Sequence, residues 1–161
     1  MAALVRARRG QVDEARDLLE AALEHRTQGS AVTPEVDCDI VAETGDWDRA
    51  DKVLARARDL SARGGLLGLP AYSDRLEGRA ALAAGDATKA VERLELARGR
   101  FHGLGARWEQ ACTELRLAEA HGAVGDPAAA RTWVLAAMPV FDELGSLREI
   151  GQARDLLGRQ G

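Results

Sequence analysis

Three histidines and two cysteines are the residues of this 161-residue chain that most readily bind metals or act as nucleophiles: His25, His102, His121, Cys38 and Cys112. A structural or catalytic zinc site is usually built from pairs of such ligands placed about two to five residues apart. No two of the five have that spacing. We therefore expect no metal site, and we expect both cysteines to be small residues of the core or of a groove.

Acidic residues near His121 are the next candidates for chemistry. Glu114, Glu119 and Asp126 lie close to it in sequence, but no nearby residue would serve as a nucleophile or oxyanion donor. The glycine-rich segment RGGLLGLP, residues 63–70, lacks the Lys-Ser/Thr pair of a Walker phosphate loop. His121 itself falls at a repeated position that favours packing between helices. The sequence therefore predicts no enzyme and no cofactor.

The composition indicates a water-soluble helical domain. Hydrophobic residues make up 46% of the chain, charged residues 30% and aromatic residues 4%, and Ala, Leu and Arg are abundant. The net charge of -4 argues against direct nucleic-acid binding, which needs a basic surface. No apolar run reaches the roughly 20 residues of a membrane span, and the charged start does not resemble a signal peptide. Two cysteines are too few for a secreted disulfide scaffold, so we expect a cytoplasmic location without membrane contact.

A Gly-Asp pair recurs every 40 residues. The glycines are Gly45, Gly85 and Gly125, and Gly10 precedes the first of them without an Asp. An alanine follows five residues after each of the three: Ala50, Ala90 and Ala130. Repetition at a fixed period indicates stacked supersecondary units. The Gly is expected to end one helix in the left-handed conformation, the Asp to cap the next helix, and the alanines to let two helices approach.

Apolar residues follow the three-and-four spacing of amphipathic helices throughout, and no strand is predicted. Ser146 and Glu149 match the S-x-x-E capping box at the start of the last helix. Pro139 falls inside a predicted helix, where a kink is expected. The sequence predicts an all-α domain with helices at 2–9, 12–26, 34–43, 47–63, 70–83, 87–102, 107–123, 127–144 and 147–159.

These repeated residues resemble the tetratricopeptide repeat. The segment GDWDRADKVLARA, from Gly45, carries the glycine, the aromatic Trp47 and both alanines of that pattern. GDATKAVERLELA and GDPAAARTWVLAA keep the glycine and the alanines. The resemblance implies a right-handed α-solenoid of stacked antiparallel helix pairs. The period exceeds the family's usual length of about 34 residues. In this it is similar to the helical arms of bacterial LuxR-type ATPase regulators and class III cyclases.

The resemblance divides the chain into one repeat domain, residues 1–161, which we expect to be part of a longer protein. Its units would be about 1–29, 30–64, 65–104 and 105–145, with a capping helix at 146–161. In this family the first helix of each pair lines a concave groove. Aligning the units places eight candidate binding residues there: Glu35, Asp39, Tyr72, Arg75, Arg79, Leu115, Arg116 and Glu119.

Two interpretations of the groove arginines stay open. Arg binds carboxylate or phosphate through its fork of donors, so Arg75, Arg79 and Arg116 could contact a ligand. They could equally be solvated charges paired with nearby acids such as Asp74, Glu77 and Glu119.

The leading hypothesis is a non-catalytic scaffold that binds a protein or peptide in the groove. The alternative is a sensory or regulatory arm of a multidomain bacterial transcription regulator, signalling ATPase or cyclase, which binds a small effector or another domain. A third hypothesis is self-association through exposed solenoid ends.

Overall fold

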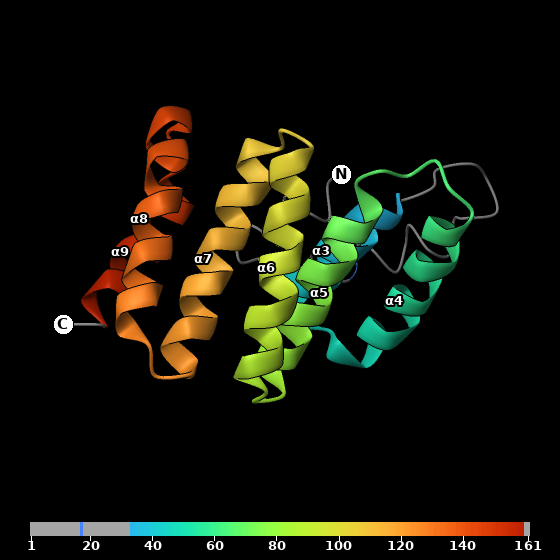
Figure 1. Cartoon of the computed structure of the whole chain (residues 1–161), viewed down its shortest axis with the longest axis horizontal. Coiled ribbons are helices and arrows are strands. Elements are labelled where there is room, and N and C mark those ends of the chain that lie inside the picture. The colour runs from blue at the N-terminus through green and yellow to red at the C-terminus, as the bar shows by residue number, and fades with distance from the viewer. Residues whose placement is uncertain (1–16, 18–32, 160–161) are drawn as a thin grey trace. The chain divides into compact units, whose positions relative to one another are not determined.

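The computed structural model describes Asp17 and residues 33–159, and these residues form helices and turns with no strand (Figure 1). Each predicted helix boundary between residues 34 and 159 agrees with the structure to within one residue. The predicted helices at 2–9 and 12–26 lie outside the described residues, apart from the helical Asp17. The helices are α3 (Pro34–Thr44), α4 (Trp47–Ala62), α5 (Leu69–Ala83), α6 (Ala87–Gly103), α7 (Arg107–Ala123), α8 (Pro127–Leu144) and α9 (Leu147–Gly158).

The repeated glycines end the helices as the sequence predicts. Gly45, Gly85 and Gly125 have φ angles of 68°, 84° and 81°, in the left-handed region that side chains with a Cβ avoid. The second glycine of each unit has the same property, with φ values of 96°, 66° and 64° at Gly65, Gly105 and Gly145. Each 40-residue unit therefore contains two turns that reverse the direction of the chain, so successive helices run antiparallel.

Side-chain capping is less regular than the sequence suggests. Asp86 and Asp126 each accept a hydrogen bond from the backbone N–H three residues on, at 3.0 and 2.9 Å. Among the described helices, α4 and α9 begin without such a bond from Asp46 or Ser146. The predicted capping box at α9 is therefore wrong. The backbone N–H of Ser146 already donates to the carbonyl of Phe141 at the end of the preceding helix, so it is not available to a box.

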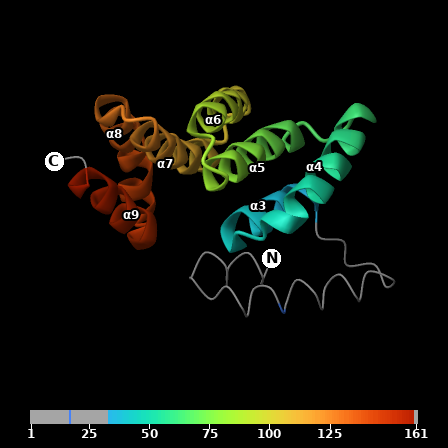
Figure 2. The same cartoon turned by 90° about the horizontal axis from the view of Figure 1, so that it is seen from below.

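The chain divides into two compact units, residues 1–76 and 77–161, with the boundary inside the continuous helix α5. In the first unit, α3 packs against α4 (Figure 2). Their buried residues are small or branched, and they include Ile40 and Val41 of α3 and Ala50 and Leu54 of α4. The expected role of Ala50 at the helix contact is consistent with its exposure of 4%.

In the second unit, α6, α7 and α8 each contact the next helix along the chain. One core cluster joins α7, α8 and α9, and the ring of Phe141 meets Trp108 edge-on at 5.5 Å between centroids. A second cluster joins the end of α5 to α6 and α7. The repeat alanines Ala90 and Ala130 are fully buried in these clusters. Pro139 lies within α8, which continues through it to Leu144.

The described part of the chain is thus an all-α domain of seven helices packed as sequential antiparallel pairs. The first helix of each pair is α3, α5, α7 or α9, and these four are called the first helices below. The second helices are α4, α6 and α8.

Candidate functional site

The eight candidate residues divide between the two units. Glu35, Asp39, Tyr72 and Arg75 belong to the first unit, and Arg79, Leu115, Arg116 and Glu119 to the second.

In the first unit, an internal ion pair joins Asp39 of α3 to Arg75 of α5. A guanidinium nitrogen of Arg75 donates to the Asp39 carboxylate at 2.5 Å, and the two residues are only 5–6% exposed. The guanidinium carbon also lies 4.9 Å from the centre of the Tyr72 ring, within the range of a cation–π contact. The charge of Arg75 is therefore compensated inside the unit. Asp39 lies 36 residues earlier in the sequence, and it was not among the acidic partners that the sequence suggested for the groove arginines.

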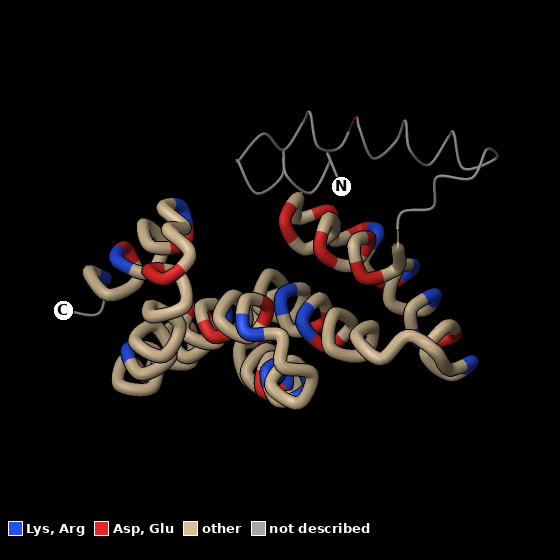
Figure 3. The backbone as a smooth tube through the Cα atoms, turned by 90° about the horizontal axis from the view of Figure 1, so that it is seen from above, with Lys and Arg blue, Asp and Glu red and all other residues tan. Residues whose placement is uncertain are grey.

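The acidic character of α3 has a consequence for the thiol beside this pair. Figure 3 shows acidic residues along α3, where Glu35 and Asp37 occupy the first turn. Burial of Cys38, followed in effect by the charges of Asp39 and Asp37, raises the pKa of its thiol to about 12. The thiol is therefore protonated at neutral pH, and a protonated thiol is a poor nucleophile.

In the second unit, the candidate residues take different environments. Leu115 is 1% exposed and belongs to the core that joins α7, α8 and α9. Arg116 donates to the carboxylate of Glu119 at 2.6 Å, one helical turn along α7. Their side chains are 15% and 31% exposed, so this pair borders solvent. The pairing is the one proposed in the second interpretation of the arginines, whereas Arg79 lies half-buried in α5.

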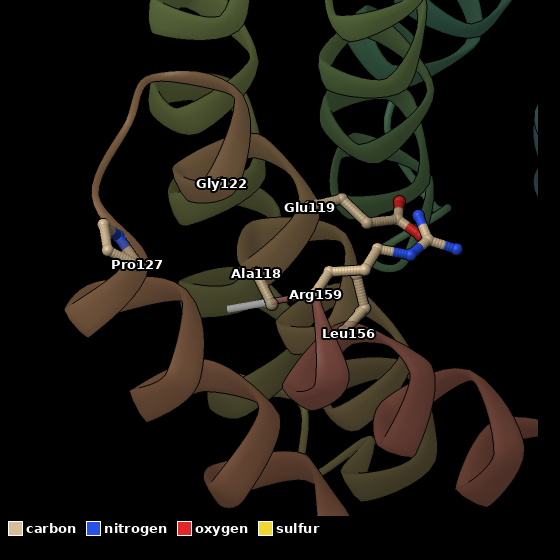
Figure 4. Close-up of a pocket in the computed structure, with 6 residues that line it drawn as sticks. All are labelled: Ala118, Glu119, Gly122, Pro127, Leu156 and Arg159. Atoms are coloured by element: carbon tan, nitrogen blue, oxygen red, sulfur yellow. The ribbon is translucent and has the colours of Figure 1, made fainter. Parts of the chain in front are cut away.

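A pocket of about 450 Å³ lies beside Glu119. It is lined by Ala118, Glu119, Gly122, Pro127, Leu156 and Arg159, from α7, the first residue of α8, and the end of α9 (Figure 4). Figure 4 shows the side chains of Glu119 and Arg159 pointing toward one another across it. Of these six residues only Glu119 was predicted from the sequence.

The pocket lies beside the last turn of α7, where Glu119 and Gly122 face Leu156 and Arg159 at the end of α9. In the 40-residue register Gly158 is equivalent to Ala118 and Arg159 to Glu119. This register is the sequence signal that could have pointed to Arg159.

A buried polar network links α6, α7 and α8. Glu114 of α7 is 3% exposed and accepts from the Arg98 Nε atom of α6 at 2.9 Å and from the Gln110 side-chain amide at 2.8 Å. The Arg98 guanidinium also stacks over the ring of Trp133 in α8, 4.8 Å from its centre. Both hydrogen bonds go to Glu114 Oε1, and together with the Trp133 contact they link α6, α7 and α8.

His121 is half-buried near the end of α7. Neither of its ring nitrogens is exposed or has a hydrogen-bond partner within the described part of the chain. In residues 33–159, no group of three or more His, Cys, Asp or Glu side chains has the geometry of a metal site. None of the helices described here is both long enough and apolar enough to cross a membrane.

The resemblance to the tetratricopeptide family stays a prediction. No model of a known protein family matches the chain, and neither does any curated protein or any solved structure.

Proposed function

We propose that this chain is a non-catalytic module of the tetratricopeptide type, a right-handed superhelix that binds a protein or peptide on the face made by its first helices. In the second unit this face is formed by α7 and α9. Paired helices that expose one continuous face present a surface on which a peptide can lie, either as a helix or as an extended segment.

One observation carries the proposal. Within residues 77–159, Cα atoms of α7 and α9 come within 8 Å of each other, whereas those of α6 and α8 do not. α6 and α8 are bridged instead by long side chains, as Arg98 and Trp133 illustrate. First helices that approach more closely than second helices curve a stack toward the first-helix side, so that side becomes the concave one.

The chemistry of that side supports the same conclusion. The Arg116–Glu119 pair lies partly exposed on α7, next to the pocket that α9 leaves open. A partner can exchange its own charged groups with such a pair at little net cost, because a partly exposed ion pair contributes little to stability. Specificity then comes from matching the charges and filling the pocket.

The test is to select peptides against the whole chain from a random display library. Selected peptides should bind Arg116→Ala and Glu119→Ala variants about tenfold more weakly than the unmodified chain, a change of about 1.4 kcal/mol. Arg131→Ala and Glu95→Ala are matched controls, because these residues are exposed on the second helices α8 and α6. Binding affected only by the control variants, or a library that yields no binding sequence, would contradict the proposal.

The pocket also favours the second candidate, a regulatory arm that responds to a small effector. Its volume of about 450 Å³ lies in the range of small-molecule sites, about 300–1,000 Å³. If the chain regulates a catalytic or DNA-binding domain, occupation of this pocket should change that domain's activity. An activity indifferent to substitutions in the pocket would argue against this second function.

A further inference from the structure

We infer that the pocket between α7 and α9 binds a small organic anion that carries an aliphatic chain, a short-chain carboxylate being its simplest form. The pocket adjoins the Arg116–Glu119 pair that the peptide proposal uses, and the inference rests on the regulatory alternative by naming the chemical class of its effector. It adds an effector-binding activity to the module.

The walls of the pocket suit an aliphatic chain. Leu156 of α9 and Pro127 of α8 present apolar side chains, and Ala118 of α7 is fully buried beneath them. Gly122 contributes no side chain, and a Cβ built at that position would meet no atom within 4 Å. The space beside the last turn of α7 is therefore open and bounded mainly by carbon, which favours removal of an apolar chain from water.

The charges at the pocket favour an anion over a cation. Glu119 supplies a carboxylate to the lining, and Arg116 already neutralises it at 2.6 Å. Arg159 adds a second guanidinium to the lining at the end of α9, and its side chain points toward Glu119 (Figure 4). These three charges sum to one excess positive charge. A guanidinium binds a carboxylate through two parallel hydrogen bonds, which is the strongest simple contact this lining offers.

The helix ends around the pocket do not reverse this balance. α7 ends here and α8 begins here, so the negative end of one helix dipole adjoins the positive end of the next. The last carbonyls of α7 are also occupied, because the carbonyls of Ala120 and His121 accept from backbone N–H groups of the following turn. The side-chain charges therefore decide which ion binds.

The experiment uses the whole chain and three probes of equal chain length: hexanoate, hexylamine and 1-hexanol. Calorimetry or ligand-observed NMR should show hexanoate binding one site, with a dissociation constant on the order of 1 mM for a ligand of about eight non-hydrogen atoms. Hexylamine and hexanol should bind at least about tenfold more weakly, because neither can pair with Arg159.

Two pairs of variants locate the site. Arg159→Gln should weaken hexanoate binding about five- to tenfold, whereas Arg154→Gln, which changes an exposed arginine of α9 outside the lining, should leave it unchanged. Gly122→Leu places a side chain in the pocket and should abolish binding. Gly99→Leu makes the same change on α6, where the added side chain also meets open space, and should have no effect. Circular dichroism of each variant verifies that the helices form.

The inference is overturned by any of three results. One is that hexanoate does not bind at concentrations up to about ten times the expected dissociation constant. The second is that hexylamine or hexanol binds as well as hexanoate. The third is that hexanoate binds a folded Gly122→Leu variant with unchanged affinity. Since none of these measurements involves a peptide, failure here leaves the peptide-binding proposal standing, and failure of the peptide selection leaves this site standing.

Discussion

Replacing Gly78 by alanine tests the close packing of α5 on α6. A Cβ at Gly78 would lie 2.7 Å from Cγ and 3.1 Å from Cδ2 of Leu94, and 3.2 Å from the carbonyl oxygen of Ala90. Leu94 is fully buried, and its Cγ is not the free end of the side chain, so it cannot move away without disturbing its neighbours. The glycine is therefore the residue that allows the two helices to meet.

The expected magnitude combines two opposing effects. Alanine in a helix interior gains about 1 kcal/mol over glycine through its lower conformational freedom in the unfolded chain. Overpacking of a filled core costs about 1–3 kcal/mol. We therefore expect Gly78→Ala to lower the free energy of unfolding by up to about 2 kcal/mol, the core term prevailing because the contact is shorter than real Cβ contacts allow.

Urea denaturation of the whole chain measures this change, with Gly99→Ala as the matched control. Gly99 lies in α6, and an added Cβ meets open space there, so this variant should gain about 0.5–1 kcal/mol. In a Leu94→Ala background the obstruction is relieved, and Gly78→Ala should become favourable, with a coupling energy of about 1–3 kcal/mol. If Gly78→Ala stabilises the chain as much as Gly99→Ala does, the close approach of α5 and α6 is refuted.

Three further substitutions test other parts of the structure. Glu114→Ala should lower the free energy of unfolding by about 2–3 kcal/mol in a urea titration, because it leaves Arg98 without its buried carboxylate. A loss no larger than that caused by replacing an exposed residue would count against the network. Asp126→Ala should cost about 1 kcal/mol in the same assay and Asp46→Ala less, because only Asp126 makes a capping bond; equal losses would show that capping is not responsible. Burial raises the pKa of the Cys38 thiol from about 9 to about 12, so as the pH rises the unfolded chain loses the thiol proton before the folded chain does. The free energy of unfolding should therefore fall progressively as the pH rises above about 9. Cys38→Ala should remove that alkaline dependence, and an unchanged pH profile would exclude it.

The helices could be predicted because their signals are local. The spacing of apolar residues indicates where each helix runs. A glycine indicates where it ends, because glycine readily takes the positive φ angle found at Gly85 and Gly125. Both effects act over a few residues, so they can be recognised in the sequence without knowledge of the partners. The same holds for the Arg116–Glu119 pair, because residues three apart on a helix always lie near each other.

The candidate site was less predictable. Alignment of the units placed both Arg75 and Glu119 on the groove side of their helices, but Arg75 is buried against Asp39, whereas Glu119 borders the pocket. A repeat alignment assigns a residue to a side of its helix and does not say how deeply neighbouring segments bury it. Arg159 is equivalent to Glu119 in the 40-residue register, so the period gives its side of the helix but not its position at a pocket.

The sequence alone determines the helix content, the helix ends and the antiparallel order of the helices, because these features depend on short-range periodicity and backbone sterics. Only the tertiary structure determines which charged side chains form ion pairs. Asp39 finds Arg75 across 36 residues, and Glu114 finds Arg98 across 16, because the packing of whole helices brings them together. The pocket likewise depends on how α9 lies beside α7 and the start of α8. Its shape and charge balance are properties of three helices packed together, which no single segment contains.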